Sequence, residues 1–121
     1  MKKILFLFIA LISLMSCEHK VTLISAGIIA DDFVKERLNF PAEAEFEYSH
    51  VGDVTSESTF TVYNQFTAKN AFGVRSTYVY KAKMVYLGGE WTDINNWTYT
   101  LLLIENSSTR EQAMYFSPND K

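Results

Sequence analysis

Hydrophobic residues recur every three or four positions near the start of the chain and every second position through most of the rest. The first pattern predicts one amphipathic helix, capped by Ser25, that ends before Pro41, because the residue before a proline is disfavoured in helical dihedrals. Arg37 interrupts its apolar side, so we expect the helix to lie on a surface rather than to be enclosed. The apolar side consists of Ala26, Ile29, Ala30, Phe33, Val34 and Leu38.

Alternation of apolar and polar residues after the helix predicts four strands and a short fifth. Only Asn64 breaks the apolar side of the second strand. The segments are 43–48, 59–69, 74–86, 97–104 and 114–116. This order predicts an α+β fold: one N-terminal helix packed on one face of a four- to five-stranded antiparallel meander sheet. The opposite face is expected to be polar except for Tyr63, Val79, Val85 and Leu102, and to be either solvated or covered by a partner.

The segment before the helix has the features of an export leader. Lys2 and Lys3 precede the apolar run Ile4–Ile12, which has the length of a signal-peptide core and not the roughly 20 residues of a membrane-spanning helix. The next residues, Leu14-Met15-Ser16-Cys17, resemble the lipobox of bacterial lipoproteins, with Met15 bulkier than the usual residue. The resemblance implies cleavage of residues 1–16, a thioether-linked diacylglycerol on Cys17 and usually a further acyl chain on the new amine.

Cys17 is the only cysteine, so no intramolecular disulfide can form, and acylation would cap a thiol that is otherwise exposed to an oxidising compartment. Two or more acyl chains anchor a protein stably to a membrane. We therefore expect a lipid-anchored protein of the bacterial cell envelope. The sequence leaves open which membrane carries the anchor and which face of that membrane the domain lies on. Its parts would be a tether at 17–23, one α+β domain at 24–117 and a polar tail at 118–121. The alternatives are a secreted protein with an unmodified cysteine and an uncleaved N-terminal anchor.

Charge narrows the range of partners. Of 11 Lys and Arg, two leave with the leader, and the remaining nine face 14 Asp and Glu, a formal net charge of −5. Nucleic acids and anionic lipid surfaces both attract clustered Lys and Arg. We therefore expect no nucleic-acid partner.

Two segments carry motifs. Phe33–Phe46 reads F-V-K-x-x-L-x-x-P-x-x-A-x-F, and Ala68–Gly73 reads A-x-N-x-F-G before a long strand. Together they resemble a family of small bacterial and phage-encoded proteins, many of them lipoproteins, in which an Arg often follows the Gly; Arg75 lies at a shorter spacing. The family has no established activity, so the resemblance implies the fold and no mechanism.

The second motif also has an interpretation from its residues alone. Asn70 and Gly73 tolerate the left-handed dihedrals that tight turns require. A folding role is the leading interpretation of this turn and a binding role the alternative. Phe72 is expected to pack back against the end of the helix.

Candidate catalytic residues are few. His19 lies in the tether and His50 in a loop after the first strand, and both are expected to be exposed loop residues. Asp53 follows His50 by three positions, but two ligands make a poor metal site, since catalytic zinc has three protein ligands. The acidic residues of the first strand are interpreted as a solubilising edge rather than a glycosidase pair: Glu43, Glu45 and Glu47. We expect no metal, no cofactor and no enzyme.

The loop between the last two long strands is the most suggestive segment. Trp91 offers an aromatic ring beside the amide and carboxylate groups of Asp93, Asn95 and Asn96, a combination that can bind a sugar or a peptide. Asp93 and Asn95 lack the downstream Gly and bidentate Glu of a calcium loop. The alternative is a connection whose tryptophans pack on the sheet. Tyr63 is a further candidate contact.

Three hypotheses for function follow. The first is a non-enzymatic binding module, held at a membrane by the lipid on Cys17, whose partner is an envelope protein, a peptide or a glycan. The second, from the phage side of the resemblance, is an exclusion or immunity factor. The third is an envelope enzyme that uses carboxylates and Arg75.

Overall fold

The computed structural model describes residues 21–121. The expected signal peptide, the expected lipidation site Cys17, His19 and most of the expected tether lie outside the described residues. The described part begins with one helix, α2 (Leu23–Lys35), and a 3-10 turn, η1 (Pro41–Glu43). The remaining elements are β1 (Glu45–Phe46), β2 (Val51–Val54), β3 (Thr59–Lys69), β4 (Arg75–Tyr86), the 3-10 turn η2 (Ile94–Asn96), β5 (Trp97–Asn106) and β6 (Gln112–Tyr115).

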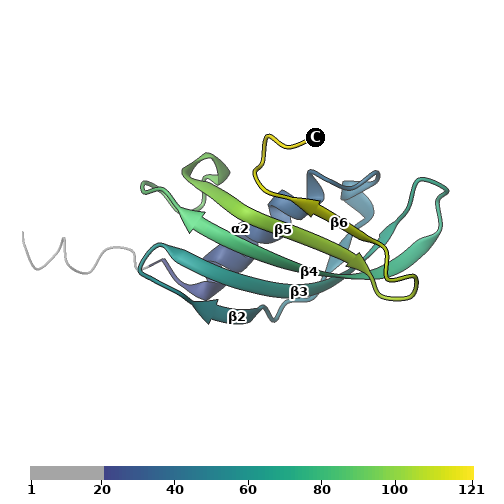
Figure 1. The fold of residues 1–121 in the computed structure, drawn as a ribbon, viewed down its shortest axis with the longest axis horizontal. Helices are drawn as coiled ribbons and strands as arrows, with labels where there is room; N and C mark the ends of the chain where they lie inside the picture. Colours follow the sequence, from purple (N-terminus) through teal and green to yellow (C-terminus); the bar gives the residue numbers. More distant parts are fainter. Residues whose placement is uncertain (1–20) are drawn as a thin grey trace, which may run out of the picture.

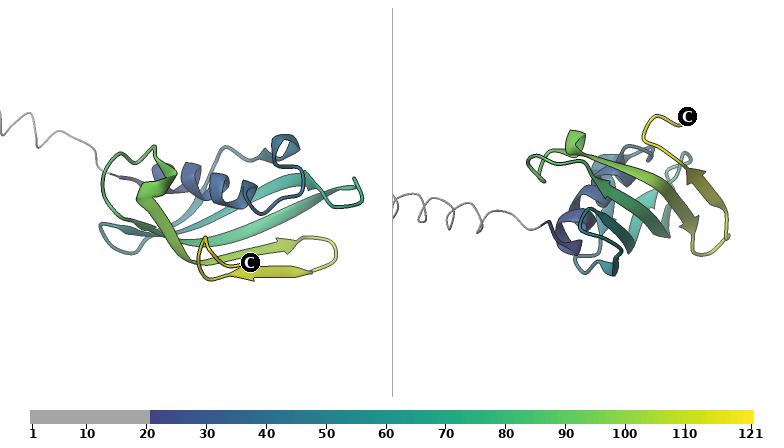
Figure 2. Two further views of the ribbon diagram at one scale, coloured as in Figure 1. Left: turned by 90° about the horizontal axis from the view of Figure 1, so that it is seen from above. Right: turned by 60° about the vertical axis from the view of Figure 1, so that its left-hand side comes forward.

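The strands form one antiparallel sheet in the order β1-β3-β4-β5-β6, and β2 pairs with β3 on the same side as β1 (Figure 1). Helix α2 lies across one face of this sheet (Figure 2). The predicted α+β fold is therefore confirmed, with six strands rather than four or five. The additional strand is β2, whose sequence Val-Gly-Asp-Val does not alternate and which lies exposed at the edge.

The core lies between the helix and the sheet. Ala26, Ala30 and Val34 of α2 are fully buried, as are Val62, Ala82 and Leu102 of three successive strands. Aromatic residues fill the remaining space; the rings of Phe33 and Tyr99 meet edge to face with centroids 5.1 Å apart. The predicted apolar side of the helix is thus the side that packs on the sheet.

The ends of α2 differ from the prediction. Thr22, not Ser25, is the N-cap: its hydroxyl accepts a hydrogen bond from the Ser25 amide, and the Ser25 hydroxyl accepts one from the Thr22 amide. This reciprocal capping box explains why the helix begins at Leu23, inside the expected tether. The helix ends at Lys35 rather than near Pro41, because the amides of Arg37 and Leu38 bond three residues back and tighten the last turn.

A bulge in β5 corrects the predicted placement of Leu102. Tyr99 pairs with Met84 and Leu101 pairs with Lys83, so Thr100 is an extra residue in the ladder. Regular alternation from Trp97 places Leu102 on the face away from the helix, but the extra residue reverses the alternation. Leu102 is therefore fully buried beneath the helix.

The C-terminal residues are held against the fold by Arg37. Its guanidinium donates hydrogen bonds to the Tyr99 hydroxyl and to the carbonyls of Ser117, Pro118 and Asp120. Hydrogen bonds from the amides of Phe116 and Ser117 to the Asp120 carboxylate lower the pKa of that group. The cationic residue at the end of the predicted helical pattern thus lies two residues past α2 and binds this segment.

Helix α2 has 13 residues, and no helix in the described range 21–121 is long and apolar enough to cross a bilayer.

Candidate functional site

The sheet face turned away from α2 carries a hollow of about 580 Å³. Among residues 21–121 no helix or strand packs on this face, and the side chains of Val51 and Tyr63 are 67% and 41% exposed. The volume is within the range of small-molecule and cofactor pockets, about 300–1,000 Å³. The hollow is lined by Glu47, Ser49, Val51, Tyr63, Asn64, Gln65, Val79, Tyr80, Lys81, Leu103 and Glu105.

The strand register places these residues in rows across the sheet. Val51 pairs with Tyr63, Tyr63 with Lys81, Lys81 with Leu103, and Leu103 with Met114. Successive strand residues point to opposite faces, so Phe60 and Val62 enter the core while Tyr63 points outward. The five residues therefore form one continuous row that we call the open-face row, in which Tyr63 lies between Val51 and Lys81.

Polar groups surround the apolar centre of the hollow. The Lys81 ammonium lies 5.7 Å from the centre of the Tyr63 ring, at cation-π distance, and it is in no ion pair within residues 21–121. Glu105 lies in the adjacent row, where its carboxylate accepts a hydrogen bond from Gln112 at 3.0 Å. Glu47 lies at the opposite rim. The hollow thus combines an aromatic ring and aliphatic side chains with charged groups of both signs.

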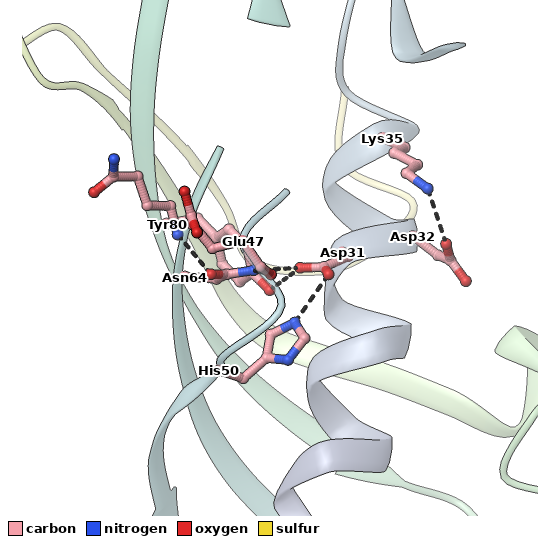
Figure 3. Close-up of polar contacts among 8 residues, drawn as sticks. Asp31, Asp32, Lys35, Glu47, His50, Asn64 and Tyr80 are labelled. Atoms are coloured by element: carbon pink, nitrogen blue, oxygen red, sulfur yellow. Dashed lines mark hydrogen bonds and ion pairs between the residues drawn. The ribbon is translucent and has the colours of Figure 1, made fainter. Parts of the chain in front are cut away.

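A second polar cluster lies on the other side of the sheet, beneath α2. The Asp31 carboxylate accepts a hydrogen bond from the Tyr80 hydroxyl at 2.6 Å and one from the Asn64 amide at 3.2 Å (Figure 3). Its second oxygen lies 2.9 Å from His50 Nε2. Asn64 also donates to the Glu47 carbonyl at 3.0 Å. One carboxylate therefore links the helix to β3, to β4 and to the segment before β2.

Burial dominates the electrostatics of this cluster. Burial and the negative charge of Asp31 raise the pKa of Tyr80 far above its ordinary value, so the phenol remains a donor at every physiological pH. The side chains of Asp31 and His50 are 15% and 7% exposed. The prediction that His50 is an exposed loop residue is therefore wrong. The His50 ring is buried next to α2, where it contacts the Asp31 carboxylate.

The contacts of the cluster join three segments of the sheet side to the helix. Within residues 21–121, no hydroxyl forms a hydrogen bond with His50, and no group of three His, Cys, Asp or Glu is placed to hold a metal ion. Sequence analysis missed the cluster, and the one available signal was Asn64, the polar residue on the apolar side of β3.

Gly27 has no side chain, and the space that this leaves beside the helix is filled by the His50 ring. A Cβ atom at position 27 would overlap the ring. Gly27→Ala is therefore expected to lower the free energy of unfolding by about 1–3 kcal/mol, as overpacking does, although helix propensity alone favours Ala by about 1 kcal/mol. Denaturant unfolding measures the change. In a His50→Ala background the same substitution should be neutral or stabilising; a loss of equal size there would contradict the assigned contact.

The polar side chains of the Trp91 loop form hydrogen bonds with other groups of the same loop. The Asp93 carboxylate accepts from the Asn95 amide at 2.9 Å, and the Asn96 side chain donates to the Glu90 carbonyl at 3.0 Å. The ring of Trp91 is half-buried against the core, and its carbonyl accepts from the Trp97 indole at 2.8 Å. Since Trp97 points toward the helix side of the sheet, the structure does not bring this loop together with Tyr63.

The turn between β3 and β4 is likewise held by its own groups. The Asn70 side chain accepts from the amides of Phe72 and Val74, and Gly73 has a φ of +78°. Arg75 donates to the Thr67 hydroxyl and to the Glu43 carbonyl. The prediction that Phe72 packs back against the end of the helix is wrong. Phe72 is 90% exposed, because the turn lies beyond the end of the sheet.

Protein-family models, curated proteins and solved structures were all compared with the chain, and none matches. The class is therefore defined by the fold: an α+β domain with one helix on one face of a six-stranded antiparallel sheet.

Proposed function

We propose that this chain is a lipoprotein of the bacterial cell envelope, anchored through Cys17, whose domain binds a partner on the open face of its sheet without chemical conversion. The observation that carries the proposal is the hollow of about 580 Å³, lined in part by Tyr63, on the face that α2 leaves uncovered. The leader pattern before Cys17 supports the location.

The composition of the hollow indicates the kind of partner. A half-exposed tyrosine with aliphatic neighbours resembles the aromatic anchors that contribute most of the energy at binding surfaces. Lys81, Glu47 and Glu105 at its margins supply hydrogen bonds and charge that fix orientation. An amphipathic segment of an envelope protein or a glycan combines apolar and polar groups in this way, and a nucleic acid does not fit a domain of net negative charge.

The two ends of β2 provide a matched pair of probes. Val51 pairs with Tyr63 on the open face, whereas Val54 pairs with Phe60 and lies on the helix side. The two side chains are 67% and 61% exposed. A photo-crosslinking residue at position 51, in living cells, is expected to give a discrete adduct that the control at position 54 does not give.

The dependence of that adduct on Tyr63 makes the test specific. Tyr63→Ala should remove most of the adduct formed from position 51, because it removes the aromatic ring of the open-face row, on the residue that pairs with Val51. For a glycan partner, the corresponding result is sedimentation with isolated cell-wall glycan that Tyr63→Ala abolishes and Val54→Ala retains. Equal adducts from positions 51 and 54, or an adduct indifferent to Tyr63, would reject the open face as the binding surface.

A further inference from the structure

Two isoleucines lie exposed on the outer side of α2. Ile24 is 70% exposed and Ile28 is 43% exposed. Residues four apart are neighbours on a helix surface, so the two side chains form one apolar patch. The patch makes no contribution to the core, which uses the opposite side of the helix.

The outer side of α2 changes character along its length. The first turn contains no acidic residue, although acidic residues are favoured there by the helix dipole. Charge appears only further on, where Asp32 and Lys35 form an ion pair of 3.8 Å. The apolar part is therefore confined to the half of the helix that begins at Leu23.

Two more exposed apolar residues lie at the same end of the molecule. Val54 ends β2, and Leu87 follows β4; they are 61% and 62% exposed. The pairing of Thr59 with Val85 brings the turn after β2 beside the connection after β4. In Figure 1 the turn after β2 and the connection after β4 lie on the left, where α2 begins, and the turn between β3 and β4 lies at the opposite end.

Chain length keeps this end close to Cys17. Leu23 is the sixth residue after Cys17, and an extended chain spans at most about 3.3–3.6 Å per residue, or about 20 Å in all. A lipid on Cys17 would hold the helix start within that distance of the bilayer. At so short a range docking is intramolecular, and even a small apolar patch gains from a high effective concentration.

We propose that Ile24 and Ile28 dock the domain on the bilayer that holds the lipid of Cys17, with the first two turns of α2 in the membrane interface. The inference rests on the anchor proposed above and adds an orientation to it. The occupant of the patch is the lipid surface. In this orientation the Phe72 turn lies farthest from the membrane.

The single cysteine allows a direct test in the full lipidated chain. Because acylated Cys17 has no free thiol, Ile28→Cys and Phe72→Cys each create one labelling site, at exposed apolar positions at opposite ends of the domain. Each variant carries an environment-sensitive fluorophore and is reconstituted in phosphatidylcholine vesicles. We expect doxyl-labelled lipid to quench the fluorophore at position 28 several-fold more than the one at position 72, and aqueous iodide to show the reverse order.

A label at a third position separates docking from the label's own affinity for lipid. With the fluorophore at Leu87→Cys, lipid quenching is expected in the otherwise unchanged chain and should fall to the level of position 72 when Ile24→Ser and Ile28→Ser are added.

The two proposals fail in different ways. A chain that does not float with the vesicles refutes the anchor and the docking together. A chain that floats while positions 28 and 72 are quenched alike refutes docking and leaves the anchor standing. Quenching at position 87 that survives loss of both isoleucines also rejects them as the docking residues.

Discussion

Asp31→Ala is expected to lower the free energy of unfolding by about 3 kcal/mol, the cost of leaving two buried polar groups without a partner. The carboxylate is the hydrogen-bond acceptor of the Tyr80 hydroxyl and the partner of His50 Nε2 in the described structure. Asn64 loses one bond and keeps the Glu47 carbonyl. Denaturant unfolding followed by circular dichroism measures the loss.

The next residue of the helix provides the control. Asp32 is also a carboxylate, but its side chain is 47% exposed and its ion pair with Lys35 spans 3.8 Å. Asp32→Ala should change stability by no more than about 0.5 kcal/mol, as surface ion pairs do. If both alanine variants lose the same stability, the buried network is not what holds the helix to the sheet.

A double-mutant cycle isolates the shortest bond of the network. Tyr80→Phe removes the hydroxyl that donates to Asp31 at 2.6 Å and leaves the ring in the core. In the Asp31→Ala background the same substitution should cost less than in the intact chain, because the hydroxyl has already lost its acceptor. Additive losses would mean that the two side chains act independently.

The regular parts of the fold follow from alternation alone. The segment 59–69 was predicted as a strand from its period of two, and β3 spans Thr59–Lys69. The long strand β4 pairs with β3 along its whole length, so nothing overrides the local pattern. The first predicted strand, 43–48, is reduced to Glu45–Phe46, because β1 shares its side of β3 with β2 and each covers only part of it.

The polar cluster was beyond prediction for a different reason. Asn64 signalled an interruption of the apolar face of β3, but its partner Asp31 lies 33 positions earlier and on another element. Only the packing of α2 over β3 brings the two together. His50 had no apolar or polar pattern around it, and its burial results from that same packing.

The open face was predicted in part. Tyr63 and Val79 lie on it as expected, because β3 and β4 alternate without interruption. The bulge at Thr100 puts Leu103 in the place expected for Leu102. The residue type at position 100 does not mark a bulge, so the sequence did not predict this shift. The continuity of the open-face row thus depends on the bulge at Thr100, which the sequence does not predict.

Arg37→Ala is expected to cost about 3 kcal/mol, because several charge-assisted hydrogen bonds and one aromatic contact disappear together. The guanidinium donates to the Tyr99 hydroxyl and to three carbonyls of the C-terminal segment. The Cζ atom of the guanidinium lies 4.0 Å from the centre of the Tyr115 ring, within cation-π distance. Thermal and denaturant unfolding measure the loss, with Lys35→Ala, at the half-exposed last residue of α2, as the near-neutral control.

Two further variants show whether Arg37 acts through the C-terminal segment. Arg37→Lys keeps the charge but lacks the planar fork that reaches several acceptors at once, so it should recover less than half of the loss. Deletion of residues 117–121 removes the three carbonyl acceptors and should make Arg37→Ala much less costly than in the full chain. An undiminished cost after that deletion would assign the stability to Tyr99 and Tyr115, and the C-terminal segment would then be a passive tail rather than the part of the fold that Arg37 secures.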